Sequence, residues 1–330
     1  MKAIQYASYG HPPDVADIVD IDLEILGDNE VRIRVEATPI KLNDLYCMSG
    51  KEGFRPPLPA VPGNEGVGKI IETGREVNKF VVGNRVFLPS EGGTWRDILQ
   101  TSAAELQPAP PDGDPAQLAL LCGNVLTAYL MLKDIVDLNS GDWVLQNTAN
   151  SNCGGYLIKL ARSWGYKTVN VVRRESLFDE LKALGADAVV VDSPNLAADV
   201  AARTGNAPIR LGIDALGGDA TTRIGACLAD GGTVANYGYI SGKPCEMPSQ
   251  MLISRDIRLV GFFKSRSLQM RSAAEQSAIY AECGRLVAEG TLRGKIAGVY
   301  PLQAVREALV HAAKVGDERR GKVVLVPDGA

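Results

Sequence analysis

From Trp143 to Phe263 the chain repeats one unit, a short apolar run followed by a segment with helical periodicity. Short apolar runs bounded by turn residues are typical of buried strands, and the helices between them connect strands that run parallel. A sheet built in this way is covered by helices on both faces. The repeat therefore predicts a doubly wound α/β domain. Its strands are expected at residues 143–146, 168–172, 188–191, 211–214, 233–237 and 259–262.

The first third of the chain has a different pattern, in which short strands alternate with turns. Val31, Ile33 and Val35 alternate with other residues in one such strand, and later apolar runs lie between glycines. A Pro/Asp/Gly cluster at 107–114 precedes the change to strand and helix units. We therefore expect a β-rich domain at 1–117, an α/β domain at 118–289, and a tail at 290–330 that returns to the first domain.

Composition restricts the classes of partner. With 45% apolar and 22% charged residues among 330, the chain has the make-up of a folded protein with room for two domains. A net charge of −4 argues against nucleic acid or an anionic membrane as the main partner. No apolar segment reaches membrane-spanning length, and the N-terminus has no signal or transit pattern, so we expect a cytoplasmic protein. Six scattered cysteines favour reduced thiols.

Two loops of the α/β region indicate a dinucleotide site. The loop from Gln146 to Gly154 keeps the helix-packing glycine of the usual fingerprint, but has Asn and Ser where other glycines are expected. Asn and Ser also form tight turns and donate hydrogen bonds. The next strand ends at Arg173 and Arg174, where a guanidinium can bind the 2′-phosphate of NADP. Two arginines here can also simply solvate a loop, but the surrounding pattern favours NADP(H).

The whole chain resembles a known superfamily. Its order of β domain, α/β domain and returning tail is similar to that of the medium-chain dehydrogenases/reductases. Segments 58–66, 123–129, 146–154 and 170–173 resemble, more narrowly, the mitochondrial-type 2-enoyl thioester reductases. The resemblance implies a GroES-like β-rich catalytic domain, a Rossmann NADP(H)-binding domain and a homodimer joined through the strand near 259–262. It also implies hydride transfer from NADPH to the β-carbon of an α,β-unsaturated carbonyl, with 2-enoyl thioesters as the substrate class.

The resemblance assigns cofactor contacts residue by residue. Asn124 corresponds to an Asn near the nicotinamide, and Lys322 to a tail lysine near the cofactor. The alternatives are ordinary structural roles. Tyr237 and Phe262 would then be core residues, and Lys322 would be a surface residue. Ligands of doubly wound sheets bind at the carboxyl edge of the strands, which favours the site. The other matched residues are Asn150, Ser151, Asn152, Cys153 and Gly154 in the phosphate loop, Arg173 and Arg174, Tyr237, Gly238, Tyr239 and Ile240 after the fifth strand, and Phe262, Phe263, Lys264 and Ser265 after the sixth.

Zinc relatives of this superfamily bind their catalytic metal with Cys and His. The chain has only His11 and His311, and Asn64 stands where the His of a Gly-His-Glu motif would be. Asp44 lies near the position of the Cys ligand. We therefore expect no metal site. Without zinc, alcohol oxidation lacks the Lewis acid that usually supports it. Reduction of an activated C=C bond depends less on a metal, because the carbonyl of the substrate stabilises the developing charge.

The proton donor is the point where the chain departs from the family it resembles. Those reductases carry a tyrosine just before the segment that corresponds to 58–61, and here Glu52 takes its place. A glutamate can donate the proton only if burial or a like charge raises its pKa, so the replacement can instead indicate another substrate or a proton delivered by water. Tyr46 is the first candidate donor, Glu52 the second, and Asn124 completes the catalytic set. A quinone or enone reductase, or a nucleotide-binding protein with reduced catalysis, stays open as an alternative.

Overall fold

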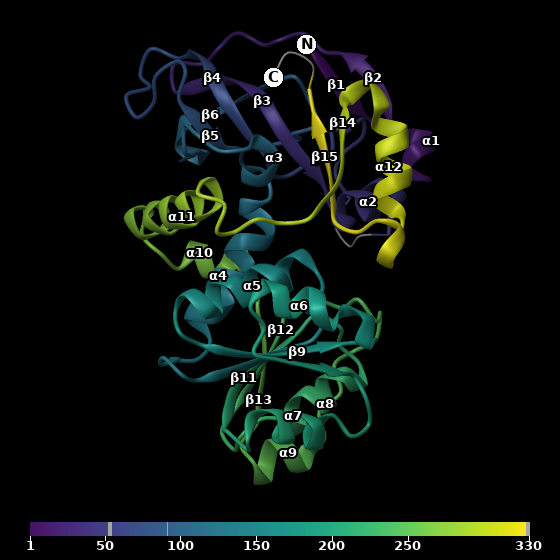
Figure 1. The fold of residues 1–330 in the computed structure, drawn as a ribbon. Coiled ribbons are helices and arrows are strands. Elements are labelled where there is room, and N and C mark those ends of the chain that lie inside the picture. Colours follow the sequence, from purple (N-terminus) through teal and green to yellow (C-terminus); the bar gives the residue numbers. More distant parts are fainter. Residues whose placement is uncertain (52–54, 91, 328–330) are drawn as a thin grey trace. The chain divides into compact units, whose positions relative to one another are not determined.

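The computed structural model describes residues 1–51, 55–90 and 92–327, and the chain forms two compact units (Figure 1). One unit, here called the β-rich unit, comprises Met1–Gly123 and Ala273–Ala330. The other, the nucleotide unit, comprises Asn124–Ser272. The division differs from the expected boundaries mainly at helix α11 (Ala273–Ala288), which the sequence placed in the α/β domain. This helix packs on α3 (Pro115–Leu118) and β7 (Gln107–Pro108) of the β-rich unit.

Side-chain contacts explain the position of α11. The Ser277 hydroxyl donates a hydrogen bond of 2.9 Å to the side-chain oxygen of Gln107. The rings of Tyr280 and Phe87 pack with their centroids 5.7 Å apart. The apolar face of α11 therefore belongs to the core of the β-rich unit.

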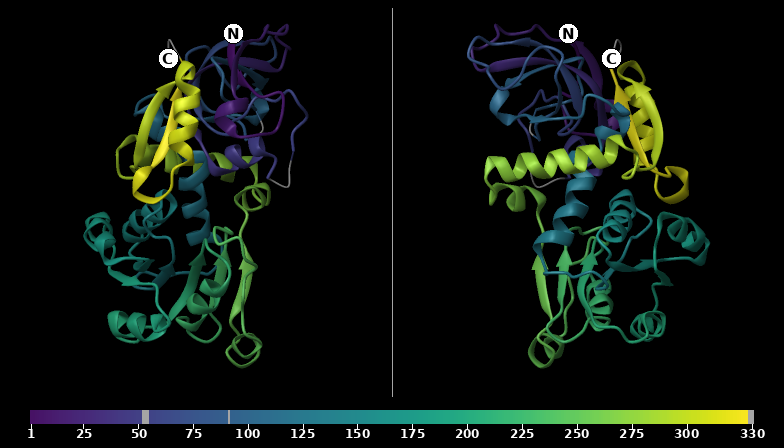
Figure 2. Two further views of the ribbon diagram at one scale, coloured as in Figure 1. Left: turned by 90° about the vertical axis from the view of Figure 1, so that its right-hand side faces the viewer. Right: turned by 60° about the vertical axis from the view of Figure 1, so that its left-hand side comes forward.

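The nucleotide unit contains one sheet of six parallel strands in the order β10-β9-β8-β11-β12-β13. The order reverses between β8 and β11, which is the switch point at which doubly wound sheets bind ligands. Figures 1 and 2 show the strands side by side with helices around them. The predicted doubly wound α/β fold is confirmed. The strands are β8 (Trp143–Gln146), β9 (Lys167–Val172), β10 (Ala188–Val191), β11 (Ile209–Asp214), β12 (Thr233–Asn236) and β13 (Arg258–Gly261).

Most helices of the nucleotide unit bury an apolar face, whereas α9 and α10 have no fully buried residue. In α5, for example, Tyr156, Leu157 and Leu160 are almost fully buried. The central strands are mostly apolar, as is typical of strands covered on both faces, and their buried polar side chains Gln146, Asn170 and Asp214 make hydrogen bonds. The helices are α4 (Leu126–Asp134), α5 (Asn152–Ser163), α6 (Phe178–Leu184), α7 (Leu196–Thr204), α8 (Asp219–Ala226), α9 (Ser249–Ser254) and α10 (Lys264–Gln269), with a 3-10 turn at Glu175–Leu177.

The β-rich unit contains a seven-stranded sheet in the order β14-β15-β3-β4-β5-β7, with β6 also paired to β3. Val31, Ile33 and Val35 of β3 are fully buried, which is the alternation expected from the sequence. The C-terminal strand β15 pairs antiparallel with β3, so the tail returns to this unit. Besides β7, the strands of this sheet are β3 (Glu30–Ile40), β4 (Val67–Thr73), β5 (Arg85–Phe87), β6 (Ile98–Ser102), β14 (Ile296–Pro301) and β15 (Lys322–Val326), whereas β1 (Lys2–Gln5) and β2 (Asp17–Asp20) pair in a separate two-stranded sheet.

Short helices cover this sheet. Helix α12 (Val305–Ala313) packs on β14 and β15, beside which Figure 2 shows it, and buries Ala308 and Leu309. Trp95 and Met48 lie in the same hydrophobic cluster. The remaining helices are α1 (Pro12–Val15) and α2 (Leu42–Ser49), with 3-10 turns at Ala103–Glu105, Leu302–Ala304 and Gly316–Glu318.

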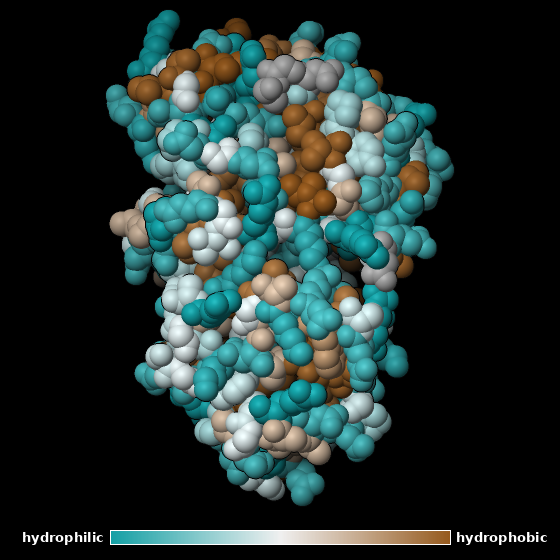
Figure 3. Space-filling model, viewed as in Figure 1, coloured by the Kyte–Doolittle hydropathy of each residue, from teal (hydrophilic) through white to brown (hydrophobic). Residues whose placement is uncertain are grey.

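One expectation about apolar segments was wrong. The helical stretch Pro115–Asp134 is long and apolar enough, by length and composition, to cross a membrane. Its most apolar window is 78% buried inside the protein, however, as in the core helix of a folded domain. The face of the molecule in Figure 3 is mostly hydrophilic, with apolar side chains in separate patches.

Candidate active site

The phosphate loop begins where β8 ends and leads into helix α5. The Ser151 hydroxyl caps the helix by accepting a hydrogen bond of 3.1 Å from the backbone N–H of Gly154. A β-carbon on Gly154 would lie only 2.5 Å from the carbonyl oxygen of Ala149, so the helix can approach the loop this closely only with glycine. The positive end of the α5 dipole therefore faces the loop, where it favours a bound phosphate.

Buried side-chain amides fix the strand ends behind this loop. The Gln146 side-chain NH₂ donates to the Asn170 side-chain oxygen at 2.8 Å and to the Gly154 carbonyl at 3.1 Å. The Asn170 NH₂ in turn donates to the carbonyl of Ala188 on β10 at 3.1 Å. This network joins β8, β9, β10 and the first turn of α5, so the loop starts from a fixed base.

Arg173 and Arg174 follow β9 directly, and both are exposed. Because β9 pairs in parallel with β8, the arginines and the phosphate loop lie at the same edge of the sheet. The arrangement is the one expected for a dinucleotide whose ribose carries a phosphate. The residues of this edge thus fit the cofactor that the sequence predicts.

The loop after β12 meets the phosphate loop. The Tyr237 phenol lies beside the Cys153 thiol and the Ser151 side chain, and burial, with Cys153 second, raises its pKa well above the usual value. Tyr237 is therefore a neutral hydrogen-bonding group at physiological pH. A β-carbon on Gly238 would lie 2.8 Å from the Ala215 carbonyl oxygen, so this loop too needs a glycine for its close approach.

The remaining predicted cofactor residues lie at or beyond the same strand ends. The backbone N–H of Phe262 donates to the Asn236 carbonyl at 2.8 Å, which continues the sheet past β13. Phe262 is only partly buried, so it is not the core residue of the alternative interpretation. The others are Asn150, Tyr239, Ile240 and Phe263, which are exposed, and Asn152, Lys264 and Ser265, which are partly exposed.

Asn124 lies in a single π-helical turn, Leu121–Val125, where the chain passes from one unit to the other. Such turns are frequent at functional sites. Tyr46 lies partly buried on α2, in the β-rich unit. Glu52 lies outside the described residues.

The β-rich unit holds a charged cluster that the sequence did not predict, formed by Lys41, Asp44, Glu65 and Lys322. Asp44 accepts a hydrogen bond of 2.7 Å from the backbone N–H of Lys41. The Lys41 ammonium lies 3.9 Å from one oxygen of Glu65, whose other oxygen makes no hydrogen bond in the structure. Lys322, predicted to lie near the cofactor, belongs to this cluster. The cluster had little signal in the sequence, because Lys41 and Asp44 lie far along the chain from Glu65 and Lys322.

Burial controls the protonation of this cluster. It raises the pKa of Asp44 to about 6, although the charge of Lys41 opposes the rise. It lowers the pKa of Lys322, which the charge of Glu65 partly offsets. The cluster can therefore gain or lose a proton near neutral pH more easily than its residue types suggest.

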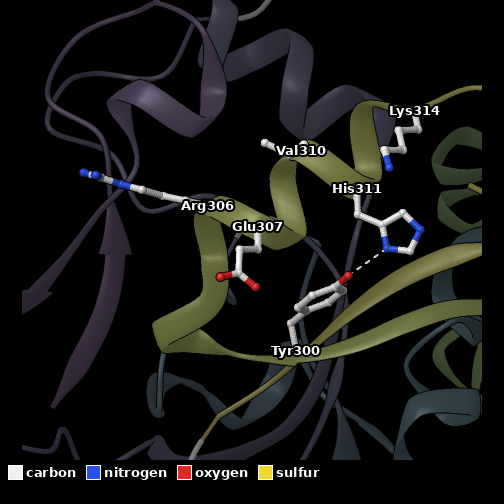
Figure 4. A pocket seen from close by; sticks show the side chains of 6 residues that line it. All are labelled: Tyr300, Arg306, Glu307, Val310, His311 and Lys314. Carbon is white, nitrogen blue, oxygen red and sulfur yellow. Dashed lines mark hydrogen bonds between the residues drawn. The ribbon is translucent and has the colours of Figure 1, made fainter.

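Two further features complete the description of the sites. Among the residues that the structure describes, no group of three or more His, Cys, Asp or Glu side chains could hold a metal ion. A surface cavity of about 470 Å³ lies beside α12, and Figure 4 shows its lining, including the hydrogen bond of 2.9 Å between Tyr300 and His311. None of the predicted site residues lines this cavity.

A GroES-like β unit together with a six-stranded dinucleotide-type sheet defines an oxidoreductase of the two-domain dehydrogenase class. The alcohol dehydrogenase GroES-like domain family matches residues 27–107, and the zinc-binding dehydrogenase family matches residues 153–278. The chain belongs to the medium-chain dehydrogenase/reductase superfamily, whose members use NAD(P), and is related to the mitochondrial enoyl-acyl-carrier-protein reductases. The mouse enzyme of that name is 33% identical over 320 residues, which cover 95% of this chain and 86% of the relative.

Solved structures agree with this family. A putative NADPH:quinone reductase from Bacillus thuringiensis has a TM-score of 0.89 and 29% identity, with 98% of each chain covered. The complex of Etr1p with NADP and crotonyl-CoA has a TM-score of 0.85 over 98% of this chain and 99% of that one. At 23% identity, this second likeness shows the fold alone.

Proposed function

We propose that the chain is an NADPH-dependent reductase that transfers hydride to the β-carbon of an α,β-unsaturated carbonyl, with 2-enoyl thioesters as its substrates. One observation carries the proposal: the capped phosphate loop and the Arg173–Arg174 pair lie at one sheet edge of a chain that is 33% identical to an enoyl-acyl-carrier-protein reductase. Etr1p, which shares the fold, is bound to NADP and crotonyl-CoA in its complex.

In this mechanism the chain binds and orients both reactants. The N-terminus of α5, with Ser151 and Asn152, holds the pyrophosphate, and Arg173 and Arg174 hold the 2′-phosphate. Asn124 orients the nicotinamide. NADPH supplies the hydride when it is bound. Protonation of the α-carbon then needs an acid, for which Tyr46 is the first candidate and Glu52 the second.

The test of this proposal is NADPH oxidation by the purified chain with crotonyl-CoA and longer 2-enoyl-CoA substrates. We expect turnover with thioesters, and loss of about 100-fold or more in kcat on removing the true proton donor, by Tyr46→Phe or by Glu52→Gln. The conservative change at the other position serves as the control.

NADPH oxidation by quinones alone would instead select a quinone reductase, the second candidate. The Bacillus structure supports this candidate, because its identity and TM-score are higher than those of the Etr1p complex. Tight NADPH binding without any turnover would indicate a nucleotide-binding protein with reduced catalysis.

Assembly and location belong to the same proposal. We propose a homodimer formed through β13, which is the last strand in the order of its sheet. We also keep the cytoplasm as the proposed location, although the mouse relative is mitochondrial by name. The substrate would be a small unsaturated carbonyl or acyl thioester, with neither nucleic acid nor membrane as a partner.

A further inference from the structure

The turn after β8 contains a residue in a backbone conformation that its type disfavours. Thr148 has a φ angle of +49°, in the left-handed region. A β-branched residue rarely adopts this region, whereas glycine does so without penalty. The penalty for such a residue corresponds to about tenfold or more in an equilibrium constant. The usual dinucleotide fingerprint avoids this problem by placing glycines in the turn.

The residue just before Thr148 is held unusually firmly. The Asn147 side-chain NH₂ donates a hydrogen bond of 2.6 Å to Asp214, and its oxygen accepts one of 2.8 Å from the backbone N–H of Ala215. The backbone N–H of Asn147 donates to the Ile213 carbonyl at 3.1 Å. Only 3% of Asn147 is exposed. Both ends of its side chain and its own backbone are therefore fixed to the end of β11 and the loop that follows it.

Asp214 is the anchor of this arrangement. Its carboxylate is fully buried and accepts hydrogen bonds from the Thr221 hydroxyl at 2.6 Å, the Leu216 N–H at 2.8 Å and the Asn236 side chain at 3.2 Å. These donors are neutral, and they come from the loop after β11, from α8 and from β12. Leu216 bonds the carboxylate oxygen that also accepts from Asn147, and Thr221 and Asn236 bond the other oxygen, so the bond to Asn147 has a fixed direction.

The turn is also held on its far side. The backbone N–H of Ser151 donates to the Thr148 carbonyl at 2.9 Å, which joins the turn to the cap of α5. A change in the φ angle of Thr148 would therefore move Ser151 and the first turn of the helix. The conformation of a single residue sets where the predicted phosphate-binding groups lie.

We propose that Asn147, held by Asp214, is a positioning residue that keeps Thr148 in the left-handed conformation and so presets the phosphate loop for NADPH. In this chain a hydrogen-bonded clamp does what a glycine does in the usual fingerprint. The inference rests on the NADPH site proposed above. It predicts that a glycine at position 148 makes the clamp dispensable.

A double-mutant cycle on the purified full chain tests this inference, with the Kd for NADPH measured by fluorescence titration. We expect Asn147→Ala to raise the Kd about tenfold in the wild-type background. Thr148 lies in the phosphate loop itself, so the Thr148→Gly variant is the reference for the double variant, which should bind within about threefold of it because glycine adopts the turn without the clamp. A purely structural role for Asn147 would give no such rescue.

Asn206→Gly in the Asn147→Ala background is the matched control. Asn206 also has a positive φ, of 61°, but lies in the exposed turn after α7. The added Asn206→Gly substitution should leave the raised Kd of the Asn147→Ala variant unchanged. Thermal unfolding checks that each variant is folded, and Asn147→Ser, which keeps a hydroxyl but cannot make both amide bonds, replaces Asn147→Ala if that variant does not fold.

The outcomes separate this inference from the proposed function. Failure of the wild type to bind NADPH would overturn the proposed function and the inference with it. Binding by the wild type combined with additive effects of the two substitutions, or with an unchanged Kd for the Asn147 variant, would overturn only the inference. Rescue by Thr148→Gly but not by Asn206→Gly would establish it.

Discussion

At the scale of single residues, Arg173 is the residue that we propose to decide the preference for NADPH over NADH. It is exposed at the end of β9, where a bound anion could pair with its charge. We predict that Arg173→Asp raises the Kd for NADPH by about 10- to 100-fold and leaves that for NADH almost unchanged, since a charge-assisted bond contributes about 1.5–3 kcal/mol.

Titration of both cofactors against the variant measures this preference. Arg203→Asp, an equal change of charge at an exposed position near the end of α7, is the control and should affect neither cofactor. An unchanged preference in the Arg173 variant would remove the assignment of NADPH.

The sequence could suggest the role of Arg173 because that role depends on one strand and the residue that follows it. The conformation of Thr148 could not be predicted, because it depends on a contact between Asn147 and Asp214, which lie in separate strand-helix units. The cluster of Asp44, Glu65 and Lys322 was missed for the same reason. Local patterns report on neighbours along the chain, whereas these sites are assembled by the fold.

At the scale of elements, the close contact between α5 and the phosphate loop depends on the absence of a side chain at Gly154. We predict that Gly154→Ala lowers the free energy of unfolding by about 1–3 kcal/mol, since the new methyl group would meet backbone atoms that cannot move aside. Chemical denaturation measures the change.

Gly155→Ala on the same helix is the matched control. A β-carbon there meets only the end of the Leu184 side chain, at 3.5 Å, which is an ordinary contact. Alanine should therefore be neutral or stabilise the protein by up to about 1 kcal/mol through its higher helix propensity. Equal losses in both variants would contradict the steric explanation.

The strands of the nucleotide unit were predicted to within one or two residues, because each is a largely apolar run with clear turn residues at its ends. The fifth strand ends one residue early, at Asn236, whose side chain turns to the Gly238 carbonyl at 2.9 Å. Strand β14 was not predicted at all. Its sequence, Ile-Ala-Gly-Val-Tyr-Pro, is interrupted by a register shift near Gly298 and has no clear alternation.

At the scale of the whole molecule, the proposed dimer depends on the outer edge of β13. Val260 in this strand is 38% exposed, and Phe263 just beyond it is 63% exposed. Paired strand edges exclude charge, and a lysine in an edge strand prevents pairing between chains. We predict that the wild type has twice the 35.2 kDa mass of one chain in solution and that Val260→Lys is a monomer.

Light scattering after size-exclusion chromatography measures both masses. Val82→Lys introduces the same charge at a 61% exposed valine of the β-rich unit and should leave the dimer intact. A monomeric wild type would remove the proposed assembly without affecting the cofactor site.

Two adjacent side chains, Gln146 and Asn147, point into opposite halves of the nucleotide sheet. Gln146 joins the network of β9 and β10, and Asn147 joins that of β11 and β12. An insertion or deletion of one residue here would pull one amide out of its network and leave buried polar groups without partners, which is costly. The two networks together therefore constrain the number of residues in this turn.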